Sequence, residues 1–199
     1  MEKQLILSVG REFGSGGHVI AEALAERFGL PLYDNNLLEH IIDKNNIIDE
    51  QLKRYDEKPI SKLFSRTVRG YSSSLEENLA HMQFNFLKNE AAKGNSYVVV
   101  GRCSESILKD CNGFVSIFVL GDKEKKAERV MEIYKLSHDE AKHLMEKEDA
   151  RRKSYHNYYS KGKWGDSRNY DFSINSSKLG IDRTIDIIEN YVKARLELM

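Results

Sequence analysis

The sequence is poor in several features that would point to a special class of protein. It has two prolines and two cysteines in 199 residues, which excludes a proline-rich linker and a disulfide framework. Cys103 and Cys111 do not have metal-ligand spacing either. The first apolar run, residues 5–9, is much shorter than a signal-peptide core or a bilayer span, and no later run is longer than a buried strand needs. We therefore expect no membrane partner and a reducing, cytoplasmic location.

An excess of charge of one sign is also absent, because 31 Lys and Arg residues balance 31 Asp and Glu residues. Without a net field that attracts nucleic acid, any anion site has to be local. The aromatic and basic residues from Tyr155 to Trp164 resemble a stacking surface for single strands. Because acidic residues from Glu146 to Asp149 directly precede them, we expect no nucleic-acid partner.

Apolar strands and amphipathic helices alternate along the chain. Compact apolar runs predict strands at 5–9, 32–34, 97–101, 115–120 and 170–175. Helical periodicity appears at 19–28, 35–43, 75–93, 123–136, 138–152 and 181–198. This order predicts an α/β domain with a buried parallel sheet. Ligands of such sheets bind at the carboxyl ends of the strands, where Gly10, Asp34, Gly101 and Asn175 fall.

A glycine-rich loop joins the first strand to the first helix, with the sequence Gly10-Arg11-Glu12-Phe13-Gly14-Ser15-Gly16-Gly17-His18. This pattern predicts a phosphate-binding site, in which the backbone N–H groups of the loop and the N-terminus of the following helix hold a phosphate group. In the pattern Gly-x-x-x-x-Gly-Lys-Ser/Thr, however, Gly17 replaces the lysine and His18 the hydroxyl residue. The amide cradle is kept, whereas the lysine charge and the Mg²⁺-binding hydroxyl are lost. The alternative interpretation is a simple tight turn.

Several motifs occur in a familiar order: Gly14-Ser15-Gly16-Gly17, Tyr33-Asp34, Gly101-Arg102-Cys103, Asp149-x-x-Arg152-x-x-Tyr155 and Trp164-Gly165-Asp166-x-x-Asn169-Tyr170-Asp171. Together they resemble the cytidylate kinase-like family, P-loop proteins similar to nucleoside monophosphate kinases. The resemblance implies a three-layer α/β fold in which a five-stranded parallel sheet has the first strand at its centre. It also implies an ATP-dependent phosphotransferase that acts on cytidylate-like nucleoside monophosphates, with small-molecule nucleotides as partners.

We expect a single domain, 1–199, with a core of 1–34, 97–136 and 169–199. The long connection 35–96 is expected to form a helical acceptor-binding flap, and the polar stretch 137–168 a lid. ATP is expected as a substrate together with Mg²⁺, whose ligands the sequence does not assign. A nucleotide- or phosphometabolite-binding protein of the same fold without turnover is the alternative function.

The candidate phosphate-binding residues are Gly14, Ser15, Gly16, Gly17 and His18. Asn175 and Ser176 follow the last strand, where the related kinases hold the donor base, although they are also good N-cap residues for the following helix. Arg11 is positioned to reach the phosphates in place of the missing lysine; an ion pair with Glu12 is its alternative. His18 is expected to donate a neutral N–H, or simply to face solvent.

Asp34 corresponds to the acidic residue beside the acceptor in the related kinases, with helix capping as its alternative. Arg102 matches their arginine that grips the acceptor's phosphate, with a buried ion pair as its alternative. Cys103 stands where relatives have an aspartate, and we expect it to be buried and apolar.

In the expected lid, Asp149, Arg152 and Tyr155 share one helix face, so Asp149 is expected to hold Arg152 in position. Arg151 is counted with the lid, although a solvated helix charge is its simpler interpretation. Arg11, Arg102 and Arg152 are the expected catalytic cations, because arginines neutralise the charge of a transferring phosphoryl group.

Overall fold

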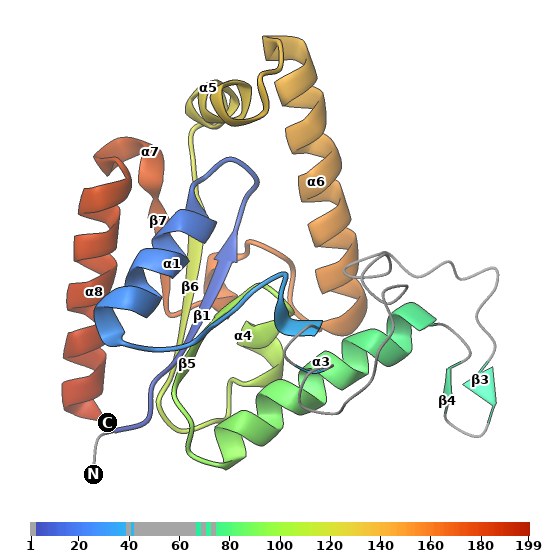
Figure 1. Ribbon diagram of the computed structural model, residues 1–199, viewed down its shortest axis with the longest axis vertical. Coiled ribbons are helices and arrows are strands. Elements are labelled where there is room, and N and C mark those ends of the chain that lie inside the picture. The colour runs from blue at the N-terminus through green and yellow to red at the C-terminus, as the bar shows by residue number, and fades with distance from the viewer. Residues whose placement is uncertain (1–2, 39–40, 42–66, 69–70, 73–74) are drawn as a thin grey trace.

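The computed structural model describes residues 3–38, 41, 67–68, 71–72 and 75–199. Its centre is a sheet of five strands in the order β2-β5-β1-β6-β7, and all neighbouring pairs are parallel (Figure 1). The strands are β1 (Ile6–Arg11), β2 (Leu32–Tyr33), β5 (Tyr97–Val100), β6 (Phe114–Leu120) and β7 (Phe172–Asn175). The central place of β1, which the family resemblance implies, is confirmed.

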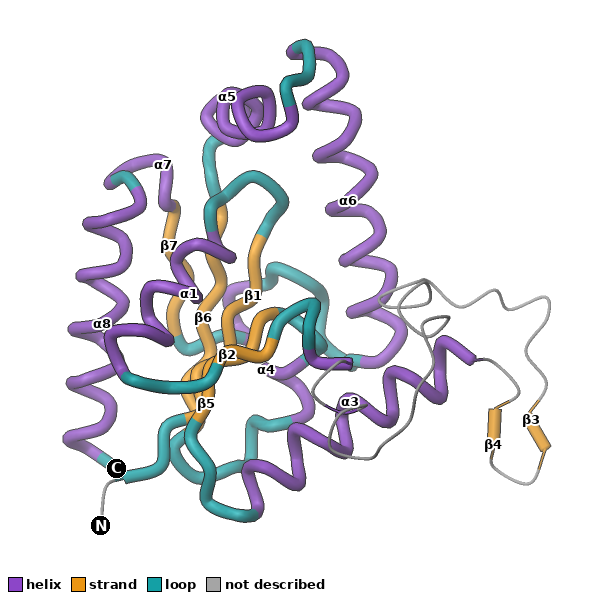
Figure 2. Tube along the Cα trace, in the orientation of Figure 1, coloured by secondary structure: helices purple, strands orange, loops and turns teal. Residues whose placement is uncertain are grey.

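Helices cover both faces of the sheet and so make a three-layer fold (Figure 2). The long helices are α1 (Gly17–Phe28), α3 (Leu75–Ala92), α5 (Lys123–Tyr134), α6 (His138–Tyr159) and α8 (Ile181–Leu198). The short elements are α4 (Ser104–Ile107), α7 (Ser176–Leu179), the 3-10 turn η2 (Ser167–Asn169) and the hairpin β3 (Thr67–Val68) with β4 (Tyr71–Ser72). In Figure 1, α5 and the start of α6 lie beyond the carboxyl ends of the strands.

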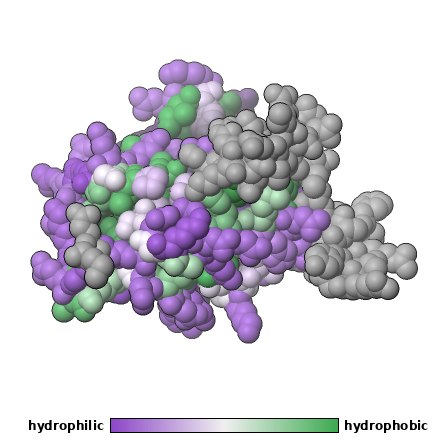
Figure 3. All heavy atoms as spheres, turned by 60° about the horizontal axis from the view of Figure 1, so that its bottom comes forward, coloured by the Kyte–Doolittle hydropathy of each residue, from purple (hydrophilic) through white to green (hydrophobic). Residues whose placement is uncertain are grey.

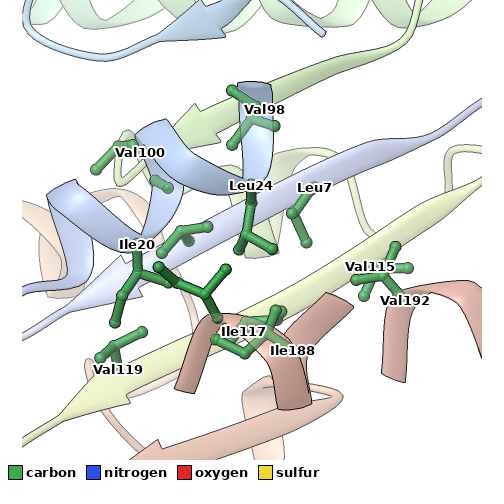
Figure 4. Packing of buried hydrophobic residues seen from close by; sticks show 14 of the residues in the cluster. Leu7, Ile20, Leu24, Val98, Val100, Val115, Ile117, Val119, Ile188 and Val192 are labelled. Atoms are coloured by element: carbon green, nitrogen blue, oxygen red, sulfur yellow. The ribbon is translucent and has the colours of Figure 1, made fainter. Parts of the chain in front are cut away.

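Two apolar clusters, one on each face of the sheet, form most of the core. On one face, α1 and α8 pack on the strands; Figure 4 shows Ile20 and Leu24 of α1 close to Ile188 of α8. On the other face, Leu87 of α3 and Leu108 pack on alternate strand residues. Because successive strand side chains point to opposite faces, the continuous apolar strands of the sequence supply both clusters.

The helices predicted at 75–93, 123–136 and 181–198 are confirmed to within two residues. The helix predicted at 138–152 extends to Tyr159, because Tyr155 and His156 are buried and extend the packed face. The sequence did not predict the four-residue helices α4 and α7. The first strand continues to Arg11, which pairs with Val119. Of the helix predicted at 35–43, residues 37, 38 and 41 are helical and residues 35–36 form a turn. Residues 39–40 and 42–43, and much of the rest of the flap predicted at 35–96, lie outside the described residues.

On the side of the molecule that Figure 3 shows, hydrophilic residues surround smaller apolar areas. Within the described residues, no helix combines the length and the apolar character that crossing a bilayer requires.

Candidate functional site

The glycine-rich loop folds as a turn between β1 and α1. Gly14 and Gly16 have φ angles of 79° and 78°, in the left-handed region that glycine adopts without steric cost. The hydroxyl of buried Ser15 donates to the Glu12 carbonyl at 2.8 Å and accepts from the Gly17 N–H at 3.3 Å, so this side chain holds the loop together. Because the N-cap is Gly16, no cap side chain covers the other amides of the first turn. These amides are suited to bind an anion.

A buried lysine supports the loop from α5. Lys126 has a side chain that is 8% exposed, and its Nζ lies 2.9 Å from Glu12 Oε2 and 3.6 Å from Asp149 Oδ2. Asp149 also accepts from the Phe13 N–H at 2.7 Å. Burial raises the pKa of Asp149, although the Phe13 N–H and the Lys126 charge lower it. This Glu12–Lys126–Asp149 network joins the loop, α5 and α6.

A cavity of about 540 Å³ opens between this loop, the start of α1 and the helices α5 and α6. Arg129 of α5 lines it and lies over the loop, since a Cβ on Gly16 would collide with its Nη1 atom. Among the described residues, none forms an ion pair or hydrogen bond with Arg129. Its guanidinium is therefore a cation available to a ligand. The sequence analysis did not single out Arg129, because nothing in the local pattern of α5 shows that it faces the loop.

The two expected lid arginines also line this cavity. Arg152 Nη1 donates to the carbonyl of Arg11 at 3.3 Å, and its guanidinium lies 5.3 Å from the centre of the Phe13 ring. Arg151 forms a 2.9 Å ion pair with Glu148. The positive charge of Arg152 opposes the rise that burial causes in the pKa of Asp149. The structure thus places α6 directly against the glycine-rich loop.

His18 and Asp34 approach each other beside the cavity. Nε2 of His18 lies 3.4 Å from Asp34 Oδ2 and 3.4 Å from Glu22 Oε1. The other carboxylate oxygen of Asp34 accepts from the Asn36 N–H at 3.0 Å, a capping-type turn bond. The capping interpretation of Asp34 therefore has a structural basis, and its role toward an acceptor stays a prediction. His18 lines the cavity with a half-exposed side chain.

Arg102 follows β5 in an uncommon backbone conformation. Gly101, Arg102 and Cys103 have φ angles of 74°, 59° and 52°, and left-handed non-glycine residues cost about 1–3 kcal/mol each. The side chain of Arg102 is buried and donates to the Asp34 carbonyl at 3.1 Å and to Gln83 at 3.5 Å. Cys103 is buried, as expected.

The three arginines expected to be catalytic line one small hollow. Arg11, Arg102 and Arg152 all line a second hollow of about 20 Å³ behind the loop. A space of this size holds about one water molecule, so a phosphate group would have to widen it. Tyr155 lines the same hollow and packs against Cys103 and Phe84.

A buried pair, His156 and Glu105, borders this second hollow, and the sequence analysis missed it. His156 Nε2 lies 2.6 Å from Glu105 Oε1, and both side chains are buried. Burial by itself lowers the pKa of His156, but the hydrogen bond and charge of Glu105 outweigh it and raise that pKa. The two residues belong to α6 and α4, so only their tertiary arrangement reveals the pair.

We expect this pair to make the stability of the fold depend on pH. A raised histidine pKa contributes stability below the unfolded pKa of about 6.5, and this contribution is lost as pH rises through the folded pKa. Denaturant unfolding between pH 6 and pH 9 should show the advantage of the wild type over Glu105→Gln shrinking as pH rises. His143→Gln, an exposed change on the same helix, should keep the wild-type slope. An equal slope in Glu105→Gln would contradict this role.

Asn175 and Ser176 form internal bonds and do not line the large cavity. Asn175 caps α7 by accepting from the Ser177 N–H at 3.0 Å and donates to Asp122 at 2.8 Å. The hydroxyl of buried Ser176 donates to the Ser15 carbonyl at 2.6 Å. The cap therefore belongs to α7 and not to the helix at 181–198.

The described residues contain no group of three His, Cys, Asp or Glu side chains arranged to hold a metal ion. Mg²⁺ that travels with a nucleotide keeps waters and phosphate oxygens as most of its ligands.

The strand order and the glycine loop after the central strand define a three-layer P-loop kinase fold. Shikimate kinase from Bacteroides thetaiotaomicron shares this fold with a TM-score of 0.55 at 12% identity, over 95% of this chain and 98% of that one. The crystal structure of an uncharacterized protein from Eubacterium ventriosum is more similar, with a TM-score of 0.76, 37% identity and coverage of 96% and 99%.

Sequence relatives narrow the class further. A cytidylate kinase from Methanococcus vannielii is 26% identical over 196 residues, which cover 95% of this chain and all of the relative. The sequence model of the cytidylate kinase-like family matches residues 6–178. The chain belongs to the cytidylate kinase-like family.

Proposed function

We propose that the protein is an ATP-dependent phosphotransferase with a nucleoside monophosphate as acceptor. The observation that carries this proposal is the cavity over the glycine loop, in which the available cation of Arg129 faces uncapped amides of α1. The kinase fold and the family support phosphoryl transfer to a small molecule. The choice of acceptor draws on the cytidylate kinase relative.

In this proposal the amides at the start of α1 hold the triphosphate, and guanidinium groups replace the missing lysine. Arg129 approaches from α5, and Arg151 and Arg152 approach from α6. The acceptor oxygen attacks the γ-phosphorus in line, the bond to the β-γ bridging oxygen breaks, and ADP leaves. Because such transfer depends on positioning and charge stabilisation, no covalent intermediate with the protein is required. Mg²⁺ would neutralise further phosphate charge.

The test is ATP consumption with Mg²⁺ across a panel of nucleoside monophosphates. We expect turnover with at least one of them, and Arg129→Met should lower kcat/KM for ATP about 100-fold, as loss of one charge-stabilising donor does. Arg183→Met, an exposed change on α8, is the matched control and should leave turnover unchanged.

The missing lysine and hydroxyl favour the second candidate, a nucleotide-binding protein without turnover. ATP binding without consumption across the whole panel would support that candidate and contradict the kinase.

A further inference from the structure

The large cavity is lined by apolar side chains as well as by cationic ones. Val19, Ile133 and Tyr134 line it and are 51%, 61% and 52% exposed. Leu144 and Phe13 line it too, and the Phe13 and Tyr134 rings are stacked with centroids 5.8 Å apart. We call these five residues the apolar wall. Large apolar side chains that stay exposed inside a concave site indicate a ligand with an apolar or aromatic part.

The arginines that line the same cavity complement a chain of phosphates. Arg129, Arg151 and Arg152 line it together with the glycine loop. A molecule that combines an aromatic ring system with several negative charges matches this mixed lining of the cavity. A nucleoside triphosphate has this form, and a volume of about 540 Å³ is in the usual range for small-molecule sites.

Of the five side chains of the apolar wall, only that of Tyr134 carries a polar group that could contact the edge of a base. His18 and Asn35 also line the cavity, at the start of α1 and just after β2, and His18 lies 3.4 Å from Asp34. Glu148, which also lines the cavity, is engaged in its ion pair with Arg151. The Tyr134 hydroxyl both donates and accepts, so it does not distinguish the hydrogen-bonding edges of different bases. Asn175 and Ser176, at the strand end where the sequence suggested base contacts, form bonds within the protein.

We infer that the apolar wall holds the base of the phosphate donor by stacking and apolar contact, and that the donor site therefore accepts nucleoside triphosphates with little regard to the base. This inference rests on the proposed function and adds the specificity of its donor. Stacking tolerates different bases because each of them has a π-face, whereas strong discrimination requires hydrogen bonds to polar groups in the site. Arg129 adds to this tolerance, since a guanidinium stacks on any base.

Calorimetry with Mg²⁺ and four ligands, ATP, GTP, CTP and inorganic tripolyphosphate, tests the inference without knowledge of the acceptor. The dissociation constants of the three nucleotides should agree within about fivefold, and tripolyphosphate should bind more weakly by about tenfold, the contribution of one stacked base. Ile133→Ala should weaken all three nucleotides by about three- to tenfold and leave tripolyphosphate unchanged. Because Ile133 is exposed, this variant is expected to fold.

Ile187→Ala is the matched control: Ile187 is also exposed, but it lies on α8 and outside the cavity. It should leave all four dissociation constants unchanged. A preference above about 100-fold for one base, the size of discrimination that hydrogen bonds to a base edge provide, would overturn the inference while the proposed kinase stands. Equal weakening of nucleotides and tripolyphosphate by Ile133→Ala would also overturn it. Absence of binding by all four ligands would overturn the proposed function, and the inference with it.

Discussion

Replacement of Lys126 by methionine is expected to lower the free energy of unfolding by about 3 kcal/mol, because removal of one partner leaves the other charges of a buried network uncompensated. Glu12 and Asp149 remain near each other, with side chains only 28% and 22% exposed. Their partial contact with water places the effect at the lower end of the range for buried pairs. For a domain of this size, the loss corresponds to a fall in Tm of about 6–12 °C.

Two further variants separate charge from packing. Lys126→Met combined with Asp149→Asn should recover part of the lost stability, because one uncompensated carboxylate is removed while an oxygen remains to accept from Phe13. Lys125→Met, the neighbouring exposed lysine whose described ion pair is with Glu128, should change Tm little. A small Tm change in Lys126→Met, equal to that of the Lys125 control, would contradict a role of the network in holding the loop.

Arg102→Ala is expected to lower kcat/KM by about 100- to 1,000-fold, the usual cost of losing a positioned charge in a phosphoryl-transfer site. Arg102 lines the small hollow together with Arg11 and Arg152, and its guanidinium donates to the Asp34 carbonyl. The substitution removes one of the three arginines that line the hollow, and it also removes the hydrogen bond to the Asp34 carbonyl just after β2. Steady-state kinetics with ATP and the acceptor found by the panel measure the effect.

Because Arg102 is buried, a loss of activity could also reflect unfolding, and Arg102→Gly separates the two causes. Glycine adopts the left-handed backbone without strain, so Arg102→Gly should be more stable than Arg102→Ala by about 1 kcal/mol and yet equally inactive. Arg168→Ala, an exposed change, is the control for loss of an arginine. If Arg102→Gly kept most of the wild-type kcat/KM, Arg102 would be a structural residue only.

Much of the fold could be predicted because its signals are local. The apolar strands, the amphipathic helix at 181–198 and the glycine loop each depend on residues that are neighbours in the sequence. Arg102 could be singled out as a candidate site residue for the same reason, because only Gly101 separates it from the buried strand β5. In contrast, the helix predicted to end at 152 continues to Tyr159, since burial of Tyr155 and His156 against distant elements extends it.

Much of the candidate site could not be predicted, because its members come from separate elements. Lys126 appears in the sequence as one of several lysines of α5, and only helix packing turns it toward Glu12 and Asp149. Arg129 has a position over Gly16 that depends on how α5 crosses the loop. The position of Asn175 at the end of a strand predicts a ligand contact. In the structure its side chain donates a hydrogen bond to Asp122, and nothing in the sequence near Asn175 indicates this bond.

The sequence by itself determined the class of fold, the place of the glycine-rich loop and the absence of a lysine from that loop, because periodicity and glycine positions are properties of short segments. Only the tertiary structure decided which cations face the loop, which polar side chains are engaged internally and where the cavity has its apolar wall. Those outcomes depend on the packing of α5 and α6 against the loop, and contacts between distant segments leave no regular trace in a single sequence.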